Sequence, residues 1–247
     1  MTAARAPGSG QPGVAVDVLT FSTEKGQLKL LLTRRQQPPY EGRWAIPGVR
    51  VGMAESTDAA AIRACAERAG LSGIYMEQLY TFSDPDRDPR SRTISVAYLA
   101  LAPVSRLRAA VRPGEVELFD VMREGAGFRL AACGGGATAQ QGAAMPELAF
   151  DHAAIIATAL NRMAGKLEYT DIGSHCLEDR SRFTLSELCE IYAAIAGRSY
   201  DLPNFRRFIK KRYEVTGRIE PTGERLKKRG TPAVVYRWKE DEPWNGC

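Results

Sequence analysis

The sequence lacks any apolar run that approaches the roughly 18 residues needed to span a membrane. Residues 1–13 are rich in Ala, Gly, Pro and Ser, and they do not contain the apolar core of a signal peptide. These two absences argue against a membrane protein and against a secreted one. We therefore expect a cytoplasmic protein that makes no membrane contact and has a flexible N-terminus over residues 1–13.

Paired cysteines are also missing. The cysteines are scattered, odd in number and never spaced as Cys-x-x-Cys. They are Cys65, Cys133, Cys176, Cys189 and Cys247. This spacing argues against a disulfide framework and against a zinc site, so we expect reduced thiols and no metal centre.

A large charge imbalance is absent from the chain as a whole but present in one segment. The net charge is only +5 over 247 residues. Between residues 204 and 239, twelve Lys or Arg residues stand against three Glu residues, a surplus of nine positive charges. Such a basic segment in a nearly neutral protein indicates a polyanionic partner. The length allows one large or two modest domains, and an apolar fraction of 44% argues against disorder.

The most informative stretch is a loop followed by a helix that we expect over residues 57–69. Ser56 or Thr57 would cap the start of this helix, and Gly70 would end it. Its expected buried side consists of Ile62, Cys65, Ala66 and Ala69.

Residues 44–71, which include this helix, resemble the Nudix box. The pattern of that box is Gly, five residues, Glu, seven residues, then Arg-Glu-apolar-x-Glu-Glu-x-Gly-apolar. The residues that match it are Glu55, Arg63, Cys65, Glu67, Gly70 and Leu71. Three residues depart from it: Val49, Ala64 and Arg68.

The departures bear on catalysis. A Nudix enzyme holds Mg²⁺ with several carboxylates on one helix turn, and the metal neutralises a pyrophosphate. Positions 64, 67 and 68 are related as i, i+3 and i+4 and are expected on one face, where this chain has Ala64, Glu67 and Arg68. One carboxylate beside a permanent cation is a poor Mg²⁺ site, whereas Arg binds phosphate well. We therefore expect a pocket with no catalytic residue, no metal and no cofactor.

Segments on both sides of the box carry further motifs. They comprise residues 30–35 with Pro38, Gly42 and Trp44 upstream, and residues 82–90, 94–98 and 148–152 downstream. Together with the box they resemble NrtR-type regulators, in which a Nudix domain is joined to a C-terminal winged helix.

The first part of the chain predicts a mixed sheet between helices. Strands are expected over residues 14–21, 28–34, 73–82, 93–102, 107–111 and 116–122. Residues 134–144 are rich in Gly, Ala and Gln and are expected to form a surface loop. A later helix, capped by Asp151 and ending before Gly165, would bury an apolar stripe. That stripe is Ile155, Ile156, Ala159, Leu160 and Met163. We assign residues 14–165 to an α/β (α+β) domain, the Nudix α/β/α sandwich.

After residue 165 the pattern changes to short helices and basic residues, so we expect a second domain over residues 166–247. Thr184 and Glu187 form a capping box, and apolar residues recur at helical spacing until Gly197. These apolar residues are Leu185, Leu188, Ile191, Tyr192 and Ile195. A second helix is expected over residues 202–213, with Phe205, Phe208 and Ile209 facing the core.

A β-hairpin is expected behind the second helix. Residues 215–221 and 233–238 would form its arms, with a basic tip at residues 227–230. Two short helices joined by a Gly-containing turn and followed by such a wing predict a winged helix-turn-helix domain that binds duplex DNA. The expected DNA-binding residues are Asn204, Arg206, Arg207, Lys210, Lys211, Lys227, Lys228 and Arg229. The basic residues of the helix, taken alone, could simply form a solvent-exposed face. The additional basic segment at the hairpin tip favours DNA binding.

The resemblance to NrtR-type regulators implies a homodimeric repressor of NAD-related genes that binds an operator and is controlled by ADP-ribose or a related nucleotide. In this view the Nudix pocket holds the effector and the winged helix responds. The expected ligand-binding residues are Arg50, Arg68, Arg87 and Arg90, with Glu55 and Glu67 as remnants or pocket-orienting groups. We expect Arg63 to pair with Glu67, and His152 to be structural rather than a catalytic base. The sequence identifies no partner for His175.

Two other functions remain open at this point. The chain could be an active Nudix pyrophosphatase that uses Glu55, Glu67 and a carboxylate such as Glu115 or Glu117, with the basic tail as an appendage. It could also be an RNA-binding Nudix relative, although a helix-turn-helix with a wing favours duplex DNA.

Overall fold

The computed structural model describes residues 11–125, 127–133, 146–227 and 232–239. The strands of the main sheet are β1 (Gly13–Glu24), β2 (Gln27–Arg34), β3 (Trp44–Ala45), β4 (Gly48–Arg50), β5 (Tyr75–Phe82), β6 (Thr93–Leu101), β7 (Val116–Glu124) and β8 (Gly127–Ala132). The remaining strands are β9 (Phe183–Thr184), β10 (Ile219–Leu226) and β11 (Ala233–Trp238). The α-helices are α1 (Thr57–Ala64), α2 (Val104–Ala110), α3 (His152–Lys166), α4 (Leu185–Ala196) and α5 (Leu202–Ile209). Single turns of π-helix follow α1 at Cys65–Ala69 and α5 at Lys210–Glu214, and a 3₁₀ turn covers Ile172–Cys176.

The main sheet has the strand order β5-β6-β1-β2-β7-β8, with β3 added to β2 and β4 added to β1. Strand β1 is central: it runs parallel to β6 and antiparallel to β2 and β4. Its side chains alternate between the two faces, as a strand requires. Val16 and Val18 enter one buried cluster, whereas Leu19 and Phe21 enter the other.

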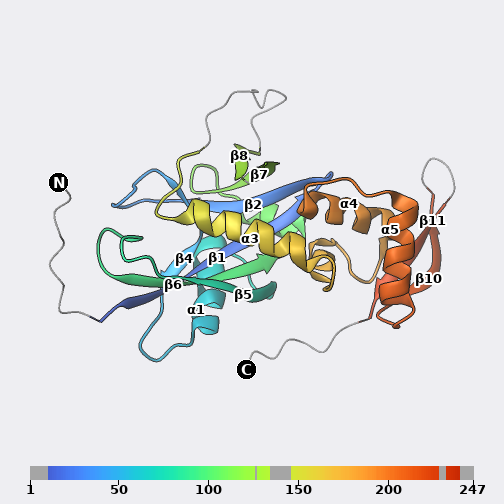
Figure 1. Cartoon of the computed structure of the whole chain (residues 1–247), viewed down its shortest axis with the longest axis horizontal. Coiled ribbons are helices and arrows are strands. Elements are labelled where there is room, and N and C mark those ends of the chain that lie inside the picture. The colour runs from blue at the N-terminus through green and yellow to red at the C-terminus, as the bar shows by residue number, and fades with distance from the viewer. Residues whose placement is uncertain (1–10, 126, 134–145, 228–231, 240–247) are drawn as a thin grey trace.

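Helices cover both faces of this sheet. Ala60 and Ala64 of α1 and Leu107 of α2 pack with Val16 and Val18. Ile155 and the rest of the expected α3 stripe pack on the opposite face, together with residues of α4. The expected α/β/α sandwich is therefore confirmed (Figure 1). None of the helices in the described ranges is long and apolar enough to cross a membrane.

Helix α1 and the π-helical turn after it together cover the expected residues 57–69, but their buried side differs. The Ser56 hydroxyl accepts a hydrogen bond from the Ala59 amide at 3.1 Å, and Gly70 ends the π-helical turn with φ of 68°. Cys65 and Ala69 are buried as expected. Ile62 is 55% exposed and Ala66 is also exposed, so both assignments were wrong. The small alanines at positions 60, 61 and 64 face the sheet instead, which allows a close approach of the helix.

Three other expectations for this domain are corrected. Residues 107–111, expected as a strand, belong mainly to α2, whose Leu107 and Ala110 are buried at the i, i+3 spacing of a helix. Strand β8 was not expected. Helix α3 continues through Gly165 to Lys166, because no residue there takes a left-handed conformation that would end it. The loop expected over residues 134–144 lies outside the described residues.

The C-terminal part forms the expected helix-turn-helix and hairpin. The Thr184 hydroxyl accepts from the Glu187 amide and the Glu187 carboxylate accepts from the Thr184 amide, which confirms the capping box. Gly197 ends α4 with φ of 66°. In α5, Phe205 and Ile209 are buried, but Phe208 is 39% exposed and does not join the core as expected.

The expected wing is the antiparallel hairpin of β10 and β11, but its first arm runs over Ile219–Leu226 and not over residues 215–221, because turn residues still follow the π-helical turn at residues 215–217. Strand β11 also pairs with β9, which directly precedes α4. The helices α4 and α5 and the hairpin lie at one end of the molecule, and α3 leads toward them across the sheet (Figure 1).

Candidate ligand pocket and nucleic-acid interface

A cavity of about 210 Å³ lies where β1, β4 and the loop before β6 meet the start of α3. Its polar lining consists of Asp17, Arg35, Arg50, Arg68, Arg87, Asp88, Arg90, Thr93 and His152, and Phe150 contributes an aromatic ring. Gly48 permits the close approach of β4 to β1, because a Cβ there would lie 2.7 Å from the Val16 carbonyl oxygen. All four arginines expected in the pocket line it, whereas Glu55 and Glu67 do not.

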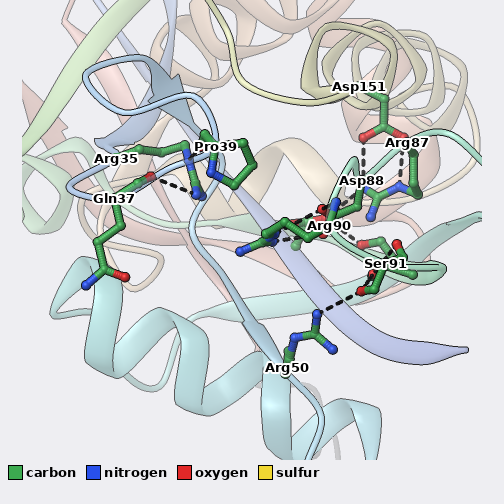
Figure 2. Close-up of polar contacts among 12 residues, drawn as sticks. Arg35, Gln37, Pro39, Arg50, Arg87, Asp88, Arg90, Ser91 and Asp151 are labelled. Carbon is green, nitrogen blue, oxygen red and sulfur yellow. Dashed lines mark hydrogen bonds and ion pairs between the residues drawn. The ribbon is translucent and has the colours of Figure 1, made fainter. Parts of the chain in front are cut away.

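Arg87 is buried and bound by two carboxylates. Its Nε donates to Asp151 at 2.9 Å, and its Nη2 donates to Asp151 at 2.7 Å and to Asp17 at 3.3 Å (Figure 2). Burial opposes the charged form, but the bonds to Asp151 and the charge of Asp17 raise the pKa of Arg87 nonetheless. This pairing occupies Asp151, which was expected to cap α3 and makes no side-chain capping bond. Arg87 therefore joins α3 to β1 rather than presenting a free charge.

Arg90 is also compensated. Its guanidinium donates to both oxygens of Asp88, at 3.0 and 2.8 Å. Asp88 is buried, yet the bonds from Arg90 lower the pKa of the Asp88 carboxyl. The aromatic ring of Phe150 lies 5.4 Å from the Arg90 guanidinium carbon.

Three further arginines of the lining have no carboxylate partner among the described residues. Arg50 donates to the Ser91 hydroxyl at 3.2 Å (Figure 2). Arg68 is exposed, and no side-chain bond holds its guanidinium within the described ranges. Arg35 donates only to the carbonyls of Pro39 and Gln37, at 2.7 and 3.1 Å. These three guanidinium groups are available to an anionic ligand.

Arg35 was missed by the sequence reasoning. It follows β2 directly, beside Arg34, and strand alternation does not continue into the turn that decides which of the two faces the pocket. The Arg35 guanidinium carbon lies 4.7 Å from the centre of the Phe150 ring. Burial and the charge of Arg90 lower the pKa of Arg35, which places it in a positive environment.

Glu55 and Glu67 lie outside the pocket beside Arg63. Arg63 donates to both oxygens of Glu55 and, as expected, also approaches Glu67, at 3.4 Å. The bonds from Arg63 and from the Gly52 amide lower the pKa of Glu55 to about 2. Glu55 therefore connects the loop before α1 to Arg63 of that helix.

Positions 64, 67 and 68, expected on one helix face, do not share it. Ala64 is fully buried, whereas Glu67 and Arg68 are exposed on the π-helical turn. The wider turn that starts at Cys65 changes the spacing assumed for a regular α-helix. In the described part of the chain, no group of three or more His, Cys, Asp or Glu side chains is placed to hold a metal ion. Within the box, the carboxylates of Glu55 and Glu67 both lie beside Arg63, and positions 64 and 68 supply no carboxylate.

The two alternative carboxylates also lie outside the pocket lining. Glu117 accepts a hydrogen bond from the Gly114 amide at 2.9 Å. Glu115 lies 3.5 Å from Arg112, and Arg112 donates to the Arg68 carbonyl at 3.0 Å. Arg112 thus connects Glu115 to the end of the box helix.

Both histidines have structural partners. The Nδ1 atom of His152 accepts from the Ile46 amide at 2.9 Å, and burial lowers the pKa of this histidine. His175 stacks on Tyr75 with ring centres 3.9 Å apart, and its Nδ1 lies 2.8 Å from Arg180. Tyr75 lies 100 residues away from His175 in the sequence and could not be identified as its partner there, whereas Arg180 is only five residues away and was overlooked.

The expected DNA-binding residues that the structure describes are all exposed. Asn204, Arg206, Arg207, Lys210 and Lys211 are exposed on α5 and the turn after it, and Lys227 is exposed at the end of β10. Lys228 and Arg229 lie outside the described residues. A cavity of about 250 Å³ lies between α4, α5 and the hairpin. Its lining includes Ser186 of α4, Arg206 of α5, Lys210 of the turn after α5 and Arg225 of the hairpin, so basic residues of the helix and of the wing border the same cavity. Arg225 was not expected, because its pairing position in the hairpin depends on a register shift after Pro221.

Two protein families match separate parts of the chain. Residues 11–124 match the NUDIX domain family, and residues 180–238 match the NrtR DNA-binding winged helix domain. The ADPR responsive transcriptional repressor NtrR of Acinetobacter baylyi is 29% identical over 229 residues, which cover 92% of this chain and 82% of the relative. An ADP-ribose pyrophosphatase of Methanocaldococcus jannaschii is 32% identical over 145 residues, 59% of this chain and 71% of the relative.

A solved structure extends the likeness to three dimensions. The crystal structure of Shewanella oneidensis NrtR complexed with a 27mer DNA superposes with a TM-score of 0.72 at 28% identity, covering 92% of this chain and 93% of that one. A MutT/nudix family protein from Enterococcus faecalis has the same TM-score at 29% identity, covering 96% and 90%. The chain therefore belongs to the Nudix family and, within it, to the NrtR-type proteins that join a Nudix domain to a DNA-binding winged helix.

Proposed function

We propose that this protein is a transcriptional repressor whose Nudix pocket binds ADP-ribose, or a related nucleoside diphosphate, without cleaving it. The observation that carries the proposal is the set of uncompensated arginines at the pocket, Arg35, Arg50 and Arg68. Guanidinium groups bind phosphate through paired hydrogen bonds, and these groups have no carboxylate to compete for them in the described structure. The Acinetobacter relative, described as responsive to ADPR, supports this ligand class.

The absence of cleavage is part of the proposal. A pyrophosphatase of this type would bring Mg²⁺ to the phosphates with several carboxylates. Here Ala64 is buried, Glu55 is held by Arg63, and Arg68 takes a box position where the common pattern has Glu. These features support a pocket that retains phosphate recognition and has lost the metal site.

The output of the proposed sensor is DNA binding by α5 and the wing. Arg206 and Arg207 would approach the bases, while Lys210, Lys211, Lys227, Lys228 and Arg229 would contact phosphates. Recognition of a two-fold operator would require a homodimer, which we include in the proposal together with NAD-related target genes. A ligand changes DNA affinity only by binding the DNA-competent and incompetent states unequally.

Three assays on the full chain test this function. Excess ADP-ribose at 100 times its Kd should raise the free energy of unfolding by about 2.7 kcal/mol. The same ligand should change the affinity for a duplex selected by the protein from a random library. Incubation of ADP-ribose with Mg²⁺ should give no AMP. If ADP-ribose changed neither the stability nor the DNA affinity, the proposed sensor function would be refuted.

The runner-up is an active ADP-ribose pyrophosphatase, which the likeness to the Methanocaldococcus enzyme favours. Glu115, close to Arg112 at the end of the box helix, is the candidate for a supplementary metal ligand. Mg²⁺-dependent turnover near the median enzyme value of about 10 s⁻¹, abolished by Glu115→Gln, would establish this function instead.

A further inference from the structure

Arg123 links the Nudix sheet to two helices at once. It lies near the end of β7, and its Nη2 donates to the Leu160 carbonyl of α3 at 2.5 Å and to the Ile195 carbonyl of α4 at 3.3 Å. Helix α3 belongs to the sandwich, whereas α4 is the first helix of the helix-turn-helix. One side chain of β7 therefore contacts two helices, α3 of the sandwich and α4 of the helix-turn-helix.

The end of α4 is built to receive this cation. Ile195 is in the last turn, where carbonyl groups have no partner within the helix and the helix dipole favours a positive charge. Gly197 follows, and a Cβ there would lie only 2.5 Å from the Cδ of Arg123. The absent side chain at position 197 thus makes room for the arginine.

The bonding of Arg123 is poor for a residue whose role is stability alone. It has no carboxylate partner among the described residues, and its buried Nε has no hydrogen-bond partner. Desolvation lowers its pKa, which shows that the charge is held away from water at a cost. An apolar side chain of similar size often gives equal or greater stability at such a site. What the arginine adds is a fixed geometry between Leu160 and Ile195.

Helix α3 connects this contact to the ligand pocket. Its first residue, His152, lines the pocket, and the preceding Asp151 holds Arg87 of the pocket wall. Leu160 follows eight residues later, about 12 Å along the same rigid helix. A ligand that shifts α3 as a whole would therefore move the Leu160 carbonyl relative to Arg123.

We infer that Arg123 is the positioning residue that couples occupancy of the Nudix pocket to the placement of α4, and through it to DNA affinity. This inference rests on the proposed function. Such coupling requires two arrangements of α3 and α4. In one, Arg123 donates to the carbonyls of both Leu160 and Ile195, as in this structure; in the other, it donates to only one of them. A ligand that binds these arrangements unequally changes DNA affinity, and by reciprocity DNA changes ligand affinity by the same factor.

Four full-length proteins test the coupling: wild type, Arg123→Met, Arg123→Lys and, as a matched control, Arg129→Met. Arg129 is an exposed arginine on the neighbouring strand β8, and it pairs with Glu124. For each protein the Kd for a duplex selected by the wild type is measured with and without saturating ADP-ribose, and the Kd for ADP-ribose is measured with and without the duplex. The ratio of the paired values is the coupling factor.

We expect Arg123→Met to reduce the coupling factor at least fivefold while the Kd for ADP-ribose without DNA stays within twofold of wild type. Arg123→Lys should retain part of the coupling, because its ammonium reaches one carbonyl, and Arg129→Met should match the wild type. An unchanged factor in Arg123→Met, beside a large factor in the wild type, overturns this inference but leaves the proposed function intact. A wild-type factor of one overturns both. If Arg123→Met does not fold, Gly197→Ala supplies the second test, because its methyl group displaces Arg123 from the opposite side.

Discussion

The guanidinium of Arg63 holds both carboxylate oxygens of Glu55, each at 2.8 Å. The same Arg63 donates to the Arg50 carbonyl at 2.9 Å. The retained residues of the box therefore fix the strand that carries a pocket arginine, although neither Glu55 nor Arg63 lines the pocket itself.

This arrangement gives the first prediction. Arg63→Met removes the bond to Arg50 and should weaken ADP-ribose binding about three- to tenfold, the range expected for one net hydrogen bond. Isothermal titration measures the change. Glu67→Gln is the matched control, since it touches Arg63 only at 3.4 Å, and it should bind like the wild type. Equal affinity of Arg63→Met and wild type would refute the supporting role.

The second prediction separates free arginines from compensated ones. Arg35→Gln, Arg50→Gln and Arg68→Gln should each weaken ADP-ribose binding about tenfold or more, because a hydrogen bond to a charged group contributes about 1.5–3 kcal/mol. Arg108→Gln, which disrupts only an exposed pair with Glu24, should have no effect. Competition with a fluorescent nucleotide gives the affinities. A uniform small loss across all four variants would show that the ligand binds elsewhere.

The third prediction concerns the orientation of the box helix. Ala64→Glu should lower the free energy of unfolding by about 3 kcal/mol or more, because it places a carboxylate in a filled apolar layer. Ala66→Glu, on the exposed side, should change it by about 0.5 kcal/mol or less. Urea unfolding compares the two variants. Similar stabilities would mean that Ala64 does not face the sheet.

The helix-turn-helix illustrates what local sequence can predict. The capping box at Thr184 and the left-handed Gly197 are decided by neighbouring residues, so both were predicted correctly. Strands β1, β2 and β6 were likewise found from their apolar patterns.

The errors come from interactions between distant segments. Arg87 looked like a free phosphate ligand because its partners, Asp17 and Asp151, lie 70 and 64 residues away. Ile62 was predicted to be buried because it is the largest apolar residue of α1, whereas the small alanines of that helix face the sheet. In the segment 107–111 a helical signal was present, Leu107 and Ala110 at i, i+3, and it was overlooked.

The fourth prediction concerns DNA phosphates. Lys211→Ala should reduce the slope of log affinity against log salt by about one unit. Lys210→Ala should reduce it less, because Glu214 at 3.8 Å already compensates part of that charge. Fluorescence anisotropy at several salt concentrations gives the slopes. Arg106→Gln, in the sandwich, serves as the control, and a Lys211 variant with an unchanged slope would remove this residue from the interface.

The fifth prediction follows from His175. Burial and the nearby Arg180 lower its pKa from 6.5 to about 3, so the unfolded chain takes up a proton first as the pH falls. Stability from this group is complete above about pH 6.5 and is lost progressively toward pH 3, by about 2 kcal/mol between pH 7.5 and pH 5. His175→Phe keeps a ring against Tyr75 but cannot titrate, so its loss over that interval should be smaller. Denaturant titrations at pH 7.5 and pH 5 measure the free energy of unfolding of both proteins. Equal losses of stability in the wild type and in His175→Phe would exclude His175 as the cause.

The short strand β9 ties the hairpin to the helices by pairing Phe183 and Thr184 with Tyr236 and Val235. Since Thr184 also begins α4, the base of the hairpin and the start of that helix turn as one body. Any tilt of α4 would therefore be passed on to β10 and β11 through these backbone pairs.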